Sequence, residues 1–274
     1  MTNFDKIRNY YKSFDEQNRL LSSNSGRLEF ETTMGILKKY LPEKAAVLDL
    51  GGGAGAYSFP LAAEGYEVYL ADLSEDLIEK AKKFGKTQDA CPVAYDVRNA
   101  TDLGAYRDEQ FDVVIVLGPL YHLLEEAERK QCVSEIRRVL KPGGLAFAGF
   151  IPRLSGSIGI VDRYFNHPGQ VNENILQRVF ETGRFSNLLD VGFQEGYYPS
   201  VDEIEELFSA NGFGKKLIRS LRGFGYEKED ALYRLETENP EMFKTVMKLL
   251  NDTSEQKAII EMCGHAIYVG CKQS

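Results

Sequence analysis

Residues 46–57 have the sequence AVLDLGGGAGAY, and this stretch decides the fold. Its first part is short, apolar and β-branched near its start, which favours a strand buried in a parallel sheet. The glycines that follow allow a sharp turn and let the backbone approach a ligand where a Cβ would clash. Residues 56–63 then have the pattern of the first turns of a helix. A strand, a glycine turn and a helix in this order predict a cofactor site at the carboxyl edge of a sheet.

The composition limits the kinds of partner. The chain has 274 residues, which suffices for one large domain or one domain with an elaborated lid. Its formal net charge of −8 disfavours a nucleic-acid partner. No segment approaches the about 18 apolar residues of a membrane helix, and the first residues lack the apolar core of a signal peptide, so we expect a soluble, cytoplasmic protein without a membrane partner. The four scattered cysteines and three histidines predict reduced thiols and no metal site.

Residues 1–45 are expected to form a helical N-terminal cap. Aromatic and apolar residues recur there at helical spacing, namely Phe4, Ile7, Tyr10, Tyr11 and Phe14. A serine-rich break follows, and a second helix ends before Pro42. The stripe is compatible with simple packing or with a cap that closes over a cofactor. In the second case Tyr10 would contact the ligand, and Arg27 would reach one of its carboxylates.

Strands and helices alternate from residue 46 to residue 152. Strands are expected at 46–50, 66–71, 91–95, 111–117 and 145–151. The helix expected at 125–140 stops at the sequence KPGG of residues 141–144, because proline cannot continue a helix and glycine supplies the turn. Apolar strands separated by helices predict a parallel sheet that is covered on both faces. Residues 153–198 depart from this rhythm and predict a helical insertion over the ligand-binding edge.

Two cofactors fit the glycine turn. Gly51, Gly53 and Ala56 satisfy the pattern G-x-G-x-x-A, and Asp72 lies near the distance expected for an acid on a ribose, so an NAD-dependent oxidoreductase is one interpretation. The other is S-adenosylmethionine. The sequence DLGGGAG of residues 49–55 resembles the first motif of class I (Rossmann-like) S-adenosylmethionine-dependent methyltransferases.

The resemblance extends over residues 46–152. In that family an acid after the second strand binds both ribose hydroxyls, and Asp72, followed by Leu73, matches it. An acid that closes the third strand holds the adenine amino group, and Asp96, followed by Val97, matches it. The segments 111–117 and 118–123 resemble the fourth motif, which places Leu117 beside the cofactor, and 136–144 resembles the helix and turn before the fifth strand.

The resemblance implies a fold as well as a cofactor. We expect an α/β fold with a doubly wound, seven-stranded, mostly parallel sheet, an antiparallel last strand and helices on both faces. Residues 46–152 would bind the cofactor, 153–198 would form a lid over the acceptor, and 199–274 would complete the sheet with strands at 216–222 and 266–271. Gly51, Gly53 and Gly55 would let the chain pass close to the cofactor. Asp49 would lie near its ammonium group, or would only cap the glycine turn.

The predicted reaction is methyl transfer from S-adenosylmethionine to an oxygen or nitrogen of a small molecule. His122 is the candidate general base and Tyr121 a candidate pocket residue, although both could serve packing alone. Aromatic side chains are expected around the acceptor, namely Tyr10, Tyr11, Tyr164, Phe165, Tyr197 and Tyr198. A monomer or homodimer is expected. The alternatives are a regulatory protein that binds S-adenosylmethionine without turnover, and the NAD-dependent oxidoreductase.

Overall fold

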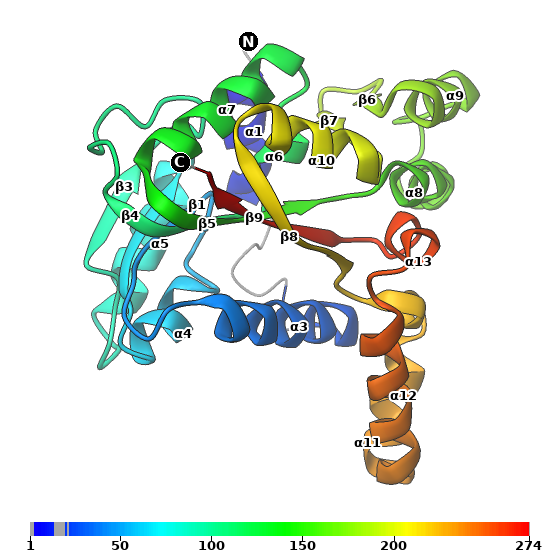
Figure 1. Ribbon diagram of the computed structural model, residues 1–274. Coiled ribbons are helices and arrows are strands. Elements are labelled where there is room, and N and C mark those ends of the chain that lie inside the picture. Colours follow the sequence, from blue (N-terminus) through cyan, green and yellow to red (C-terminus); the bar gives the residue numbers. More distant parts are fainter. Residues whose placement is uncertain (1–2, 14–19, 21, 274) are drawn as a thin grey trace.

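A computed structural model describes residues 3–13, 20 and 22–273 (Figure 1). Phe14 and the side chain of Tyr11, both part of the predicted N-terminal stripe, lie outside the described residues. Two helices are described in the N-terminal part, α1 (Asn3–Ser13) and α3 (Asn24–Tyr40). The side chain of Ser23 caps α3 by accepting a hydrogen bond from the backbone N–H of Gly26.

The centre of the molecule is a sheet whose strands follow the order β3-β2-β1-β4-β5-β9-β8. The strands are β1 (Ala46–Leu50), β2 (Glu67–Asp72), β3 (Ala94–Val97), β4 (Phe111–Val116), β5 (Leu140–Phe150), β8 (Phe213–Ser220) and β9 (Ala266–Lys272). The first five are parallel to one another, and β9 is antiparallel to both β5 and β8. The prediction of a seven-stranded, mostly parallel sheet with an antiparallel last strand is confirmed.

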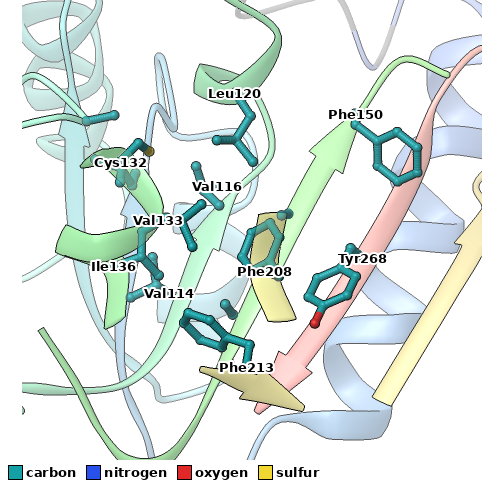
Figure 2. Close-up of a cluster of buried hydrophobic side chains, with 14 of the residues drawn as sticks. Val114, Val116, Leu120, Cys132, Val133, Ile136, Phe150, Phe208, Phe213 and Tyr268 are labelled. Atoms are coloured by element: carbon teal, nitrogen blue, oxygen red, sulfur yellow. The ribbon is translucent and has the colours of Figure 1, made fainter. Parts of the chain in front are cut away.

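Helices cover both faces of the sheet (Figure 1). One face carries α3, α4 (Ser58–Ala63) and α5 (Glu75–Gly85), and the other carries α7 (Glu126–Val139), α10 (Val201–Ala210) and α13 (Lys257–Glu261). Figure 2 shows the core under α7 and α10, where the ring of Phe208 stacks on Tyr268 with centroids 4.4 Å apart. Each large apolar side chain buried in this way contributes about 1.5–3 kcal/mol, so this layer holds α10 firmly on the sheet.

Some element boundaries differ from those expected. The third strand was expected at 91–95 but lies at Ala94–Val97. Pro92 precedes it and has no N–H to donate to a ladder, and pairing begins at Ala94, which lies opposite Tyr69 of β2. Two further strands start earlier than expected: β5 at Leu140, which pairs with Phe111 before a register shift, and β8 at Phe213.

The segment after β5 contains a second small core. It consists of α8 (Arg153–Asn166), α9 (Glu173–Thr182) and a two-stranded hairpin of β6 (Arg184–Ser186) and β7 (Glu195–Tyr197). The hairpin was missed because three residues are too few to display the alternation of a strand. Lys6 of α1 forms an ion pair of 2.6 Å with Glu195, so the N-terminal helix is tied to this hairpin. Further along the chain, η1 (Gly223–Gly225), α11 (Glu229–Glu238) and α12 (Pro240–Thr253) follow β8, and the α11–α12 pair extends away from the sheet (Figure 1).

A local test of the fold uses the start of α10. The Ser200 side chain accepts a hydrogen bond from the N–H of Glu203, and the Glu203 carboxylate accepts one from the N–H of Ser200. Ser200→Ala is expected to lower the free energy of unfolding by about 1 kcal/mol and the Tm by about 2 °C, because the N–H of Glu203 loses the hydroxyl that accepts its hydrogen bond. Ser209→Ala, at the exposed end of the same helix, is the matched control. Equal effects of both substitutions, followed by differential scanning fluorimetry, would contradict the capping assignment.

Candidate active site

A cleft lies at the carboxyl edge of the parallel strands. Its described wall follows the sheet from the β3 end to the start of β9, and Phe4 and Ile7 of α1 contribute to it. The residues predicted from the sequence that line this cleft are Asp49, Gly51, Gly53, Asp72, Leu73, Leu117, Tyr121 and His122. The carboxyl edge of an open α/β sheet is where ligands bind in this architecture.

The glycine turn after β1 requires glycine for conformational and steric reasons. Gly51, Gly53 and Gly55 have φ angles of 73°, 58° and 91°, a region that favours glycine. A Cβ on Gly51 would also lie 2.5 Å from Cγ of Pro119, which begins the helix after β4. Gly55 is not part of the cleft wall, since a Cβ there would instead meet the ring of Phe59. Gly55 therefore serves the turn, and its contact with a cofactor stays a prediction.

Asp72 presents a buried and oriented carboxylate to the cleft. It is the last residue of β2 and is 8% exposed. Its Oδ2 accepts a hydrogen bond of 2.9 Å from the N–H of Gly53, and its Oδ1 accepts one of 2.7 Å from the N–H of Ser74. These two backbone bonds fix the plane of the carboxylate, and a carboxylate, with about four acceptor positions, can bond several donors at once.

Asp49 is a second buried carboxylate in the same wall. The hydroxyl of Ser58 donates to its Oδ2 at 2.6 Å. Burial raises the pKa of Asp49 to about 6; the bond from Ser58 opposes this shift and the nearby Asp72 adds to it. Such a group gains from a cationic partner, because an opposite charge compensates the cost of burying the carboxylate.

The third strand delivers different residues to the cleft from those expected. Asp96 accepts a hydrogen bond of 2.8 Å from the hydroxyl of Tyr106, and Val97 is 42% exposed; neither lines the cleft. The strand continues to Val97, which pairs with Asp72, and the N–H of Arg98 still donates to the carbonyl of Asp72. The wall is therefore formed by Arg98, Asn99 and Ala100, a group that sequence reasoning missed.

A signal for this end of β3 was present in the sequence. The run Asn99–Asp102 is rich in residues that favour turns. The Asn99 side chain accepts a hydrogen bond from the N–H of Thr101, as in an Asx turn. β3 ends at Val97, one residue beyond the expected acid and two residues before this run begins.

The end of β4 leads into the short helix α6 (Pro119–His122). Leu117, Tyr121 and His122 all line the cleft, and the rings of Tyr121 and His122 have centroids 4.7 Å apart. His122 is only 5% exposed, and burial lowers its pKa to about 3. An imidazole with so low a pKa is neutral at ordinary pH and is a weak proton acceptor, since general bases act best near the operating pH. Catalysis by His122 stays a prediction that this environment disfavours.

Two predicted cofactor ligands from the N-terminal cap lie elsewhere. Arg27 donates to both carboxylate oxygens of Glu236 at 2.9 and 3.1 Å and to Glu31 at 2.8 Å. Its guanidinium stacks on the ring of Tyr233 at 4.1 Å, so Arg27 joins α3 to α11 outside the cleft, and this placement disfavours its predicted contact with a cofactor carboxylate. Tyr10 packs edge-on against Phe193 at 5.9 Å in a small recess beside His122, not in the cleft wall.

The aromatic side chains of the insertion also lie outside this cleft. Tyr164 and Phe165 are 58% and 72% exposed on α8. Tyr197 lies under the guanidinium of Arg129 at 3.5 Å, and Tyr198 is buried. They were expected to line the acceptor pocket, but at these positions they pack against other residues or face solvent. Sequence reasoning missed Glu29, Thr33 and His265, which line the opposite end of the cleft from Asp72.

The described part of the chain contains neither a cluster of metal ligands nor a helix that could cross a membrane. Among residues 3–13, 20 and 22–273, no three His, Cys, Asp or Glu side chains gather closely enough to hold a metal ion. Over the same described ranges, every helix is too short or too polar to cross a membrane.

Comparison with protein families agrees with this geometry. Residues 48–148 match a model described as a methyltransferase domain. A demethylmenaquinone methyltransferase from Clavibacter sepedonicus is 33% identical over 141 residues, which are 52% of this chain and 53% of the relative. A tRNA 5-carboxymethoxyuridine methyltransferase from Escherichia coli K12 is 28% identical over 113 residues, which are 40% of this chain and 41% of the relative. The chain spans about half or less of the length of the curated relatives it matches.

A solved structure extends the likeness to nearly the whole chain. A protein from Pyrococcus horikoshii OT3 superposes with a TM-score of 0.65 at 22% identity and covers 97% of this chain and 99% of its own. At this identity the match establishes the fold. The sheet order, the glycine turn and the matched domain agree: residues 48–148 have the features of a class I methyltransferase domain, and the methyl donor in that family is S-adenosylmethionine.

Proposed function

We propose that this protein transfers a methyl group from S-adenosylmethionine to an oxygen or nitrogen atom of a small molecule. The observation that carries the proposal is the buried carboxylate of Asp72, fixed by two backbone N–H groups beside the glycine turn. One carboxylate of this kind can accept both hydroxyls of a ribose through charge-assisted hydrogen bonds. The cofactor supplies a methyl group already activated on a sulfonium, so that positioning provides much of the catalysis.

The described residues of the cleft fit this cofactor. Asn99 and Ala100 lie at the end of the strand next to Asp72, where the adenine would rest. Asp49, buried and in need of a cation, would pair with the ammonium of the methionine part. Gly118 and the α6 residues after it would then surround the methyl group. Together these roles would place the cofactor along the carboxyl edge of the sheet, from β3 to β4.

An NAD-dependent oxidoreductase is less well supported. A dinucleotide carries a diphosphate, which is usually neutralised by a helix N-terminus or by basic side chains. In the described wall of the cleft the only permanently cationic side chain is Arg98, which follows β3 and not the glycine turn.

A small acceptor is favoured over RNA. The relatives include enzymes named for a quinone precursor and for a tRNA base. This chain has 41 acidic and 33 basic residues, and affinity for nucleic acid depends on clustered lysine and arginine. The described cleft wall is mostly apolar around Leu117, Leu221 and Ala266, as in small-molecule pockets.

The raised pKa of Asp49 predicts a pH-dependent affinity. The ionised carboxylate is required for pairing with the ammonium, and its pKa of about 6 leaves it mostly protonated at pH 5. Binding of S-adenosylhomocysteine, measured by isothermal titration calorimetry, is therefore expected to weaken by about tenfold between pH 7 and pH 5. Asp49→Asn removes the titrating group and should bind more weakly at pH 7 with a flat profile. A profile for Asp49→Asn that parallels the wild type would contradict this role of Asp49.

The proposed function is tested in two stages. In differential scanning fluorimetry, S-adenosylmethionine and S-adenosylhomocysteine are expected to raise the Tm, and NAD is expected to leave it unchanged. Stabilisation by NAD alone would overturn the proposal. Release of S-adenosylhomocysteine is then measured over a library of phenols, quinols and amines. Binding of the cofactor without any release across such a library would favour the regulatory alternative.

A further inference from the structure

Three polar side chains gather at the end of the cleft farthest from Asp72. Glu29 and Thr33 come from α3, one helical turn apart, and His265 comes from the residue before β9. Residues four apart on a helix share one face, so both α3 side chains face the start of β9. Asp72 ends β2, and β9 is the strand next to β5. Leu117, which follows β4, therefore lies between this cluster and the adenosine side of the cleft.

The imidazole of His265 is backed by a carboxylate. Its Nδ1 lies 3.1 Å from Oε2 of Glu29, but the two atoms are not aligned for a hydrogen bond. Nδ1 is fully buried, yet the His265 side chain retains 25% exposure, so another part of the ring is exposed. Hydrogen bonds of catalytic pairs often tighten only when substrate binds.

The backbone at His265 is held in place. Its carbonyl accepts hydrogen bonds from the N–H of Leu221 at 3.0 Å and the thiol of Cys263 at 2.9 Å. The position of the imidazole is thus set by the start of β9 and by the end of β8. Tyr121 of α6 faces it with ring centroids 6.2 Å apart, which links this cluster to the segment after β4.

Thr33 provides an independent sign of a ligand. Its side chain is fully buried in the cleft wall, and within the part of the chain that the structure describes its Oγ1 has no hydrogen-bond partner. Buried hydroxyls in folded proteins nearly always have a partner, and an unpaired one costs about 1–3 kcal/mol. A ligand group that reaches this end of the cleft would supply the missing hydrogen bond.

We propose that Glu29, Thr33 and His265 form the acceptor subsite and bind a hydroxyl group carried on an apolar, flat molecule. The inference rests on the proposed function. Thr33 hydrogen-bonds the acceptor oxygen, Nε2 of His265 is the catalytic base, and Glu29 is a positioning residue that stabilises the imidazolium. The apolar residues beside the cluster, Leu117, Leu221 and Ala266, favour a neutral hydroxyl over an ammonium.

The proton and electrons balance in this step. The O–H bond of the acceptor breaks and its proton moves to Nε2 of His265. The oxygen electron pair forms the bond to the methyl carbon, and the pair of the former carbon–sulfur bond stays on sulfur. The imidazolium next to Glu29 then returns its proton to solvent. This is the arrangement in which a carboxylate orients and stabilises a histidine base.

The test uses 4-nitrophenol and the protein saturated with S-adenosylhomocysteine. Phenol and phenolate forms of this probe absorb at different wavelengths, so its ionisation is visible in the complex without turnover. Wild-type protein is expected to bind the probe largely as phenolate at a pH one unit below the pKa of free 4-nitrophenol, because the proton passes to His265. His265→Gln should weaken binding by about tenfold and leave the bound probe as phenol. His167→Gln, the same change at an exposed histidine, is the matched control and should behave as wild type.

Isosteric variants separate the roles of the other two residues. Glu29→Gln should keep the probe bound but lower its ratio of phenolate to phenol by about tenfold, because the imidazolium loses its carboxylate. Thr33→Val should weaken binding by about threefold to tenfold without changing that ratio. All three variants should bind S-adenosylhomocysteine like the wild type, which also shows that they are folded.

The outcomes distinguish this inference from the proposed function. If wild-type protein does not bind S-adenosylhomocysteine, the proposed function fails. If it does, but the probe does not bind, stays phenol or is bound equally by His265→Gln, the acceptor subsite is overturned and the proposed function stands. Loss of S-adenosylhomocysteine binding in Glu29→Gln with the Tm retained would place Glu29 in the donor site and would also overturn the inference.

Discussion

Replacement of Asp72 by alanine is expected to weaken the binding of S-adenosylhomocysteine by at least about a hundredfold, because two charge-assisted hydrogen bonds to the ribose are lost. The carboxylate is buried and already oriented by the N–H groups of Gly53 and Ser74, so no neighbouring group can replace it. The dissociation constant is measured by isothermal titration calorimetry at pH 7, where the cofactor amine and the carboxylates carry their charges.

Two companion variants make this result specific. Asp72→Asn retains the volume and one carbonyl acceptor, and should fall between wild type and Asp72→Ala. Asp96→Ala removes the acid that the sequence alone assigned to adenine. Its partner is the hydroxyl of Tyr106, so we expect a loss of about 1 kcal/mol in unfolding free energy and an unchanged dissociation constant. Loss of binding in Asp96→Ala, with binding retained in Asp72→Ala, would refute the placement of both residues.

Gly51→Ala is expected to disrupt the cleft at its centre. The new Cβ would lie 2.5 Å from the Pro119 ring, and the φ of 73° is unfavourable for alanine. Strain and overpacking each cost about 1–3 kcal/mol, and relief of the clash must move α6 away from the glycine turn. Because the cofactor would span this junction, we expect the affinity for S-adenosylhomocysteine to fall by about a hundredfold, together with a lower Tm.

Gly65→Ala separates backbone strain from the clash. Gly65 has a φ of 90°, and a Cβ there would meet no atom within 4 Å. This control should lose about 1 kcal/mol of stability and bind S-adenosylhomocysteine like the wild type. If Gly51→Ala lost only what Gly65→Ala loses in both measurements, close approach of the glycine turn to α6 would have no role in binding.

Much of the fold could be predicted because its signals are local. The apolar run before Gly51 predicted β1, and the acid at position 72 ended β2 as expected. The KPGG turn at 141–144 correctly predicted that α7 ends, although β5 begins before the turn and includes it. The hairpin of β6 and β7 was missed because its strands are too short for periodicity to appear.

The predicted residues that line the cleft lie at or near strand ends that the sequence marks. The end of β3 was placed too early because an acid at position 96 resembled the expected ligand, although register with β2 brings Asn99 and Ala100 to the edge. The ion pair of Arg27 could not be predicted for a different reason: Glu236, which accepts hydrogen bonds from its guanidinium, is distant in sequence. The cluster of Glu29 and His265 likewise depends on a contact between α3 and the start of β9 that no local pattern encodes.

The placement of the cofactor in this cleft is tested most simply by a crystal structure of the complex with S-adenosylhomocysteine. We expect both ribose hydroxyls to bind the carboxylate of Asp72 and the adenine to lie beside Asn99 and Ala100. The ammonium should lie near Asp49, and the sulfur should point toward Leu117 and α6. Density for the ligand outside this cleft, or an adenine held by Asp96 with Asp72 unoccupied, would contradict it.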